Sequence, residues 1–245
     1  MEEERGKLVY ILPNLFTAAS IFLAMLSIFA SINGHYASAI AYIIFSLIFD
    51  GLDGRVARLT HTTSKFGVEF DSLADIVAFG VAPAVLFYFV IGKDYGQVGT
   101  LISALYVIFG AVRLARFNVT VGTYEPNVFI GLPIPTAAIT IAVWIGIYLK
   151  YEVSSVWGGV FIIGMALLSF LMVSNIRFPS FKKINLKRPN AIKILVLLIV
   201  VFFSCLYLFK LEFPAFIILL YIGYGLVRAG LTLIGVKFNK QSKEN

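Results

Sequence analysis

The sequence has little charge, and it has few of the residues that bind zinc or form disulfides. Only 13% of its 245 residues are charged, whereas 60% are hydrophobic, and a soluble globule could not hide that much apolar surface. The single cysteine, Cys205, excludes an intrachain disulfide, and two isolated histidines argue against a zinc site. The composition therefore predicts a protein that buries its apolar surface in a bilayer.

Long apolar runs follow one another along the chain. A helix needs about 20 predominantly apolar residues to cross the hydrocarbon core of a bilayer. The pattern predicts an all-α polytopic membrane protein with a single transmembrane domain over residues 1–245. About eight transmembrane helices are expected, near residues 10–32, 36–60, 64–91, 97–117, 133–150, 156–176, 191–209 and 213–236.

The breaks between these segments differ in charge. Only Lys93, Lys150 and Lys210 of the 20 basic residues fall on one side of the predicted layout, and the others fall on the opposite side. Cytoplasmic segments carry the excess of Lys and Arg, so both termini are expected in the cytoplasm, in a protein of the cell membrane. This asymmetry and attraction to anionic lipid headgroups explain the net charge of +7, and no nucleic-acid partner is expected.

Four aspartates interrupt the apolar pattern in the stretch "DGLDGRVARLTHTTSKFGVEFDSLAD", residues 50 to 75. Asp50 and Asp53 share one face of the second predicted helix, and Asp71 and Asp75 share one face of the third. The short polar turn between them makes the two helices antiparallel neighbours with their cytoplasmic ends together. Because a bare carboxylate at this depth is costly, such residues normally face a wet cavity or bind a cation.

Carboxylate oxygens are ligands for hard divalent cations such as Mg²⁺, Mn²⁺ and Ca²⁺. Four acids can hold two such ions when ligand phosphates complete the coordination, and the neighbouring Arg58 can bind the rest of a diphosphate. An alternative interpretation pairs the acids with Arg55, Arg58 and Lys65 only to stabilise a hairpin. The acids outnumber these basic residues, and an idle charge cluster is costly, which favours a ligand site.

The complete spacing D-x2-D-G-x2-A-R-x8-G-x3-D-x3-D resembles the signature of the CDP-alcohol phosphotransferases. The resemblance implies a six-helix transmembrane core, here residues 10–176, with residues 191–236 as two additional helices. It also implies a homodimer that uses divalent metal ions to displace CMP from a CDP-linked alcohol by a second alcohol.

The resemblance also implies roles for individual residues. The metal ligands would be Asp50, Asp53 and Asp71, and Asp75 would share the second ion and act as general base, although a role in metal binding alone stays open. The segment "PNLFT", residues 13 to 17, is similar to the family's first-helix element. The implied CDP-binding residues are Asn14, Thr17, Asp50, Asp53, Gly54, Ala57, Arg58, Gly67 and Asp71.

Three further stretches, "RLARFN", "FIGLPIPTAA" and "IRFPSFK", resemble the phosphatidylserine synthase branch of that family. This implies transfer of a phosphatidyl group from CDP-diacylglycerol, or an ether-lipid equivalent, to L-serine, giving phosphatidylserine and CMP. An amino-acid acceptor needs a cation for its carboxylate, so Arg113, Arg116 and Asn118 form the expected serine pocket. The arginines could instead be ordinary cytoplasmic charges or bind lipid phosphate.

Other functions stay open at this point. The acceptor could be glycerol phosphate or inositol phosphate in the same reaction. An intramembrane prenyltransferase is disfavoured, because the two acidic motifs of such enzymes lie far apart along the chain. Here all four aspartates lie within residues 50 to 75. A cation transporter could line an ion path with acids, but it would need neither the Gly and Ala spacings nor Arg58.

Overall fold

The computed structural model describes residues 2–60, 62–120, 128–179 and 211–244. Within it the chain forms two compact units: Met1–Val119 with Pro133–Val173, and Thr120–Leu132 with Ser174–Asn245. Each unit is described by itself.

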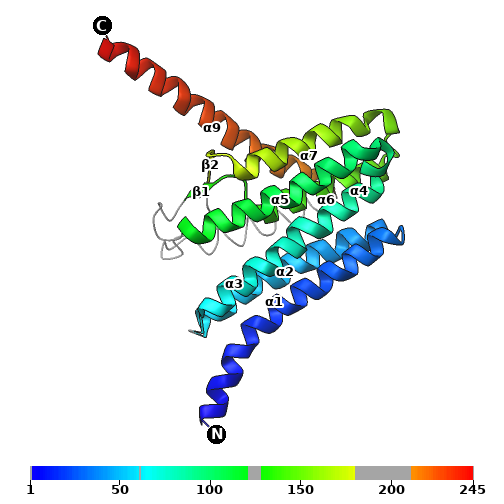
Figure 1. Cartoon of the computed structure of the whole chain (residues 1–245), viewed down its shortest axis with the longest axis vertical. Coiled ribbons are helices and arrows are strands. Elements are labelled where there is room, and N and C mark those ends of the chain that lie inside the picture. Colours follow the sequence, from blue (N-terminus) through cyan, green and yellow to red (C-terminus); the bar gives the residue numbers. More distant parts are fainter. Residues whose placement is uncertain (1, 61, 121–127, 180–210, 245) are drawn as a thin grey trace. The chain divides into compact units, whose positions relative to one another are not determined.

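The first unit is helical (Figure 1). Among the described residues of both units, five helices are long and apolar enough to cross a membrane. Four of them lie in the first unit, together with two shorter apolar helices, α6 and α7. This supports the expected polytopic helical architecture. The elements are α1 (Glu2–Ile32), α2 (Tyr36–Leu59), α3 (Lys65–Asp75), the π-helical turn η1 (Ile76–Val81), α4 (Ala82–Val90), η2 (Gly92–Tyr95), α5 (Gly96–Thr120), α6 (Ile134–Lys150), η3 (Ser155–Trp157) and α7 (Gly158–Val173).

The predicted helices between residues 10 and 176 are found with shifted ends. The first begins earlier, at Glu2, and the one expected at 64–91 is divided by the π-turn into α3 and α4. The helix expected at 191–209 lies outside the described residues. The last one corresponds to α9 (Glu212–Glu244), whose Glu212–Leu231 portion is long enough to span a membrane.

The second unit contains a strand pair that the sequence analysis did not expect. Strand β1 (Val128–Ile130) pairs antiparallel with β2 (Arg177–Pro179), with Phe129 opposite Phe178. Phe178 is buried, and its ring stacks on Tyr221 of α9 at a centroid distance of 5.6 Å. These strands are only three residues long, too short to show the alternation from which strands are predicted.

A seam of small and hydroxyl-bearing side chains joins α1 to α2. Small residues let two membrane helices approach closely, and hydroxyls add hydrogen bonds between them. The Ser20 and Ser46 hydroxyls are 2.7 Å apart, and the Ser27 hydroxyl donates to the Ala39 carbonyl at 2.9 Å. Five buried positions on α1 follow helical spacing: Thr17, Ser20, Ala24, Ser27 and Ser31. This seam continues to Thr17 and Asp53, where the candidate site begins.

Candidate functional site

The acids of α2 and α3 converge. Carboxylate oxygens of Asp50, Asp53 and Asp71 lie within 4.8 Å of one another. Asp53 is in hydrogen-bond contact with Asp71, and Asp50 with Asp75. Two carboxylates this close repel each other unless a proton or a cation lies between them. The convergence expected from the helical spacing is therefore present, and it calls for positive charge.

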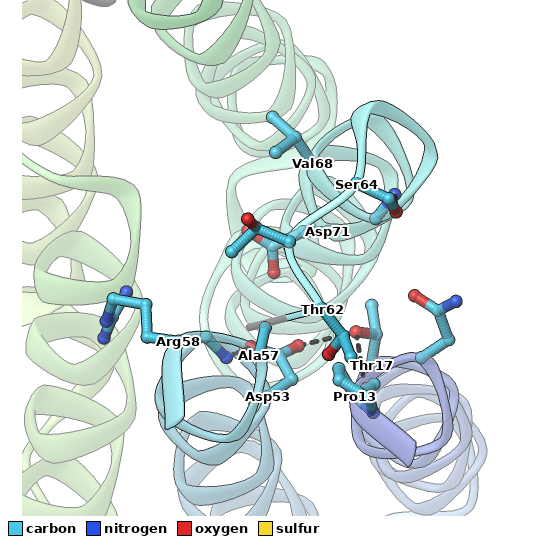
Figure 2. Close-up of a pocket in the computed structure, with 13 residues that line it drawn as sticks. Pro13, Thr17, Asp53, Ala57, Arg58, Thr62, Ser64, Val68 and Asp71 are labelled. Carbon is cyan, nitrogen blue, oxygen red and sulfur yellow. Dashed lines mark hydrogen bonds between the residues drawn. The ribbon is translucent and has the colours of Figure 1, made fainter. Parts of the chain in front are cut away.

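The Asp53 carboxylate has the most fixed orientation. Its residue is 6% exposed. The Thr17 hydroxyl donates to Asp53 Oδ2 at 2.6 Å, and the backbone N–H of Gly54 donates to Asp53 Oδ1. Figure 2 shows Asp53 directed toward Thr17, whereas Arg58 extends away from it. Thr17 on α1 thus orients Asp53, a candidate metal ligand on the neighbouring helix α2.

The donor set fits a hard divalent cation. Among the described residues, Asp50, Asp53 and Asp71 form the one group with metal-ligand spacing, and carboxylate oxygens suit Mg²⁺, Mn²⁺ or Ca²⁺. Arg55 and Lys65, which the hairpin interpretation would pair with these acids, are exposed. The residues present can therefore hold such an ion.

Removal of the Thr17 hydroxyl tests this orientation. Thr17→Val keeps the side-chain shape but removes the donor to Asp53, so we expect divalent-metal affinity to fall by roughly 10-fold, as for other outer contacts of metal ligands. Ser27→Ala is the control, because Ser27 lies in the same seam and its hydroxyl donates to the backbone carbonyl of Ala39. Calorimetric titration with Mn²⁺ should separate the two variants; equal affinities would contradict the role of Thr17.

A pocket of about 190 Å³ lies beside the acids (Figure 2). Its walls come from α1, α2, the turn before α3, and α3 itself. All the residues that the sequence analysis assigned to CDP binding line this pocket except Asp50. The full lining is Pro13, Asn14, Thr17, Asp53, Gly54, Ala57, Arg58, Thr62, Thr63, Ser64, Gly67, Val68 and Asp71.

Two glycines in the pocket lining, Gly54 and Gly67, leave space that a side chain would fill. A Cβ on Gly67 would lie 3.2 Å from Ser64 Oγ and 3.5 Å from Asn14 Oδ1. At Gly54 it would lie 3.5 Å from Arg58 Nη1, so the exposed guanidinium covers the Gly54 backbone. A methyl group at either position would fill space between polar groups that face the pocket.

The turn between α2 and α3 supplies lining residues that the sequence analysis missed. Thr62 is buried, and its N–H donates to the Ala57 carbonyl at 2.9 Å. Ser64 caps α3 by accepting the Gly67 N–H at 3.0 Å. A serine directly before the first helical residue is the available signal, since serine is a preferred N-cap residue.

The expected serine-pocket residues have different surroundings. Arg113 is 6% exposed, interacts electrostatically with Asp75, and lies 5.3 Å from the Phe117 ring centroid. Asn118 donates to the Ser72 hydroxyl at 2.9 Å, beside Asp71 in sequence.

Arg116 contacts the end of another helix. Its Nη1 donates to the Val173 carbonyl at 2.9 Å and its Nη2 to the Met172 carbonyl at 3.3 Å. The last carbonyls of a helix lack partners within it, and a cation near them is favourable. Arg116 therefore joins α5 to the C-terminal end of α7.

Comparison with known proteins identifies the family. A profile described as "CDP-alcohol phosphatidyltransferase" matches residues 10–171, which cover α1 through most of α7. The chain belongs to this family. The match lies within residues 10–176, and their assignment as a six-helix core stays a prediction.

Individual members of the family are similar over most of this chain. A CDP-diacylglycerol–serine O-phosphatidyltransferase of Helicobacter pylori is 47% identical over 95% of this chain and 96% of its own length. A protein of the same name from Methanocaldococcus jannaschii is 35% identical over 85% of this chain and 92% of its own. An archaetidylserine synthase of Methanothermobacter thermautotrophicus is 37% identical over 69% of both chains. The similarity to the first relative extends beyond the family match, toward the C-terminal part of the chain.

Proposed function

We propose that this protein transfers the phosphatidyl group of CDP-diacylglycerol to the hydroxyl of L-serine, giving phosphatidylserine and CMP. The observation that carries the reaction class is the convergence of Asp50, Asp53 and Asp71 beside a pocket, in a chain of this family. The serine acceptor is supported by the names of relatives that match along most of the chain. A serine oxygen–phosphorus bond forms, and the bond from that phosphorus to the CMP oxygen breaks.

The nucleotide end of the substrate would occupy the pocket beside the acids. Gly54 and Gly67 leave the backbone open to the cytidine, with Asn14 and Ala57 beside it, and Arg58 would bind the diphosphate through its guanidinium. Asp50, Asp53 and Asp71 would hold two Mg²⁺ or Mn²⁺ ions, with Asp75 sharing the second. When bound, such ions supply positive charge to the phosphate oxygens and to the departing CMP.

Asp75 would take the proton of the serine hydroxyl. An alcohol is a weak nucleophile until a positioned base accepts its proton, and the Asp75 carboxyl interacts both with Asp50 and with the charge of Arg113. The proton passes from the serine oxygen to the Asp75 carboxylate and then to solvent. Thr17 and the Gly54 N–H keep the neighbouring Asp53 oriented during this transfer.

Arg113, Arg116 and Asn118 would form the serine pocket. Arg113 is the best supported of the three, because it interacts electrostatically with Asp75. In the proposed reaction the serine hydroxyl must lie beside Asp75. A planar guanidinium can bind the serine carboxylate with two parallel hydrogen bonds.

Lysine replacements separate the two arginines. Lysine keeps the charge but loses the planar fork, so Arg113→Lys should raise the serine KM by roughly 10-fold with little change in the CDP-diacylglycerol KM. Arg116→Lys should in addition lower thermal stability, because Arg116 bonds to the end of α7. Steady-state kinetics and thermal unfolding of both variants check this, and an unchanged serine KM in Arg113→Lys would remove Arg113 from the pocket.

The proposal extends to the membrane arrangement. The protein would form a single transmembrane domain over residues 1–245 with eight helices. Both termini and the active site would lie on the cytoplasmic side of the cell membrane. The distribution of basic residues supports this arrangement. Assembly as a homodimer is supported by the family resemblance alone.

The test is an assay of the purified protein with CDP-diacylglycerol, Mn²⁺ and one acceptor at a time. We expect CMP release with L-serine. Release with glycerol phosphate or inositol phosphate but not with serine would reject the serine assignment. Ion flux in liposomes without CMP release from any CDP-alcohol would instead support a transporter. Parallel reactions with ester-linked and ether-linked CDP-lipids determine which chains are accepted, since one relative is named an archaetidylserine synthase.

A further inference from the structure

A wide turn begins directly after Asp75. Helix α3 keeps its ordinary bonding up to Ile76, whose N–H donates to the Ser72 carbonyl. Residues Ile76–Val81 are π-helical, and the N–H of Ala82 donates to the carbonyl of Val77, five residues before it. A π-turn holds one more residue than an α-helical turn, and such turns are frequent at functional sites.

Pro83 gives this turn a physical cause. Inside a helix, proline lacks the N–H donor, and its ring clashes with the carbonyl four residues before it. For Pro83 that carbonyl belongs to Phe79, which lies within the π-turn. Widening the helix relieves the clash between the proline ring and the Phe79 carbonyl. Pro83 still has no N–H to donate to that carbonyl.

Tyr106 of α5 supplies a donor instead. Its hydroxyl donates to the Phe79 carbonyl at 3.0 Å, and the Tyr106 side chain is completely buried. A buried carbonyl without a donor destabilises the fold, because it has lost its hydrogen bonds to water and has no replacement. The hydroxyl therefore satisfies a group that Pro83 leaves open.

The same face of α5 reaches Asp75. Tyr106, Gly110 and Arg113 are spaced by four and three residues, so they lie on one side of the helix, and all three are buried. A Cβ on Gly110 would lie 2.6 Å from Ile134 Cδ1, so a larger residue would require the end of the Ile134 side chain to move. Arg113 then interacts with Asp75.

The π-turn decides the direction in which the acids of α3 point. One extra residue rotates the next helical segment by about 100° relative to an uninterrupted helix. Helix α4 is held by buried side chains such as Leu86 and Phe87. If the turn returned to α-helix while α4 stayed in place, Asp71 and Asp75 would rotate away from the acids of α2.

We propose that Tyr106 is a positioning residue for Asp75: by bonding the Phe79 carbonyl, it stabilises the π-turn that directs Asp75 toward Asp50 and Arg113. The inference rests on the proposed phosphatidyl transfer, in which Asp75 accepts the proton of the attacking alcohol. Tyr106 itself touches no reacting atom.

The first arm of the test compares two tyrosine hydroxyls. Tyr106→Phe removes the donor to Phe79, and the control Tyr36→Phe removes a donor to another backbone carbonyl, that of Phe89 near the far end of α4. In Tyr106→Phe we expect kcat to fall by roughly 10- to 100-fold, the cost of misplacing a reacting group. The KM values for serine and CDP-diacylglycerol should change by less than about twofold, and Tyr36→Phe should resemble the wild-type protein. Equal effects of the two variants, or a KM increase in place of the kcat loss, would overturn the inference.

The second arm needs no substrate. Hydrogen–deuterium exchange of peptides covering residues 76–82 should become faster in Tyr106→Phe and stay unchanged in Tyr36→Phe. Pro83→Ala gives residue 83 an N–H, so the effect of Tyr106→Phe should shrink in that background. Unchanged exchange in Tyr106→Phe, or an equally large effect in both backgrounds, would contradict the role of Tyr106. This arm decides about Tyr106 even if the wild-type protein releases no CMP with serine, an outcome that would reject the proposed function separately.

Discussion

Asp71→Asn is expected to abolish turnover. The kcat should fall by roughly 10³-fold or more, because several kcal/mol of charge stabilisation are lost together with the ligand. Asp71 lines the pocket, and its carboxylate oxygens lie within 4.8 Å of those of Asp50 and Asp53. Asparagine has nearly the same shape, so the loss would come from the missing charge and not from packing. Metal-dependent binding of CDP, measured by calorimetry, should weaken in the same variant.

Glu69→Gln is the matched control for this substitution. Glu69 lies two residues before Asp71 on the same helix, and its side chain is exposed. Its neutralisation should leave both CMP release and CDP binding near the wild-type values. Substantial turnover in Asp71→Asn, or equal losses in the two variants, would contradict a metal-binding role for Asp71.

Asp75→Asn is expected to reduce kcat by roughly 10²- to 10⁴-fold, the usual contribution of a general base. Unlike Asp71→Asn, it should retain metal-dependent CDP binding to within a few-fold. Asp75 lies outside the compact group formed by Asp50, Asp53 and Asp71; it is in hydrogen-bond contact with Asp50 and interacts electrostatically with Arg113. These surroundings suit a group that accepts a proton at the edge of the site.

The comparison of binding with turnover distinguishes the two roles left open for Asp75. A pure metal ligand would lose CDP binding and turnover together, as expected for Asp71→Asn. Titration of both variants with CDP in the presence of Mn²⁺, beside their rates of CMP release, supplies the comparison. A loss of CDP binding in Asp75→Asn as large as in Asp71→Asn would assign Asp75 to metal binding alone.

The convergence of the acids could be predicted because it depends on local geometry. Asp50 and Asp53 are three residues apart and Asp71 and Asp75 are four apart, so helical periodicity alone places each pair on one face. The short turn then makes the two helices neighbours. Most of the helices could be located for a similar reason, since apolar length reports directly on membrane-spanning segments.

Features that depend on distant contacts could not be predicted in this way. Arg116 donates to carbonyls 56 and 57 residues further along the chain, which no local pattern reveals. The π-turn also needs more than Pro83, because the donor that satisfies Phe79 comes from Tyr106 on another helix. The strand pair β1–β2 likewise depends on the pairing of two three-residue segments far apart in sequence.

Hydroxyl side chains of the turn between α2 and α3 also line the pocket. The sequence predicts only a polar turn for "THTTSK", residues 60 to 65, yet Thr62, Thr63 and Ser64 line the pocket. Hydroxyl residues commonly occupy turns and helix caps, where they bond to the backbone. Composition alone therefore does not separate a capping hydroxyl from one that faces a ligand.

The most direct test of the central claim is the number of Mn²⁺ ions that the protein binds in the presence of CDP-diacylglycerol, measured by electron paramagnetic resonance. If the acids of α2 and α3 form the metal site, the wild-type protein should bind two ions and Asp71→Asn should lose this binding, while Glu69→Gln should keep it. Wild-type Mn²⁺ binding in Asp71→Asn, or no bound Mn²⁺ in the wild-type protein, would contradict the account.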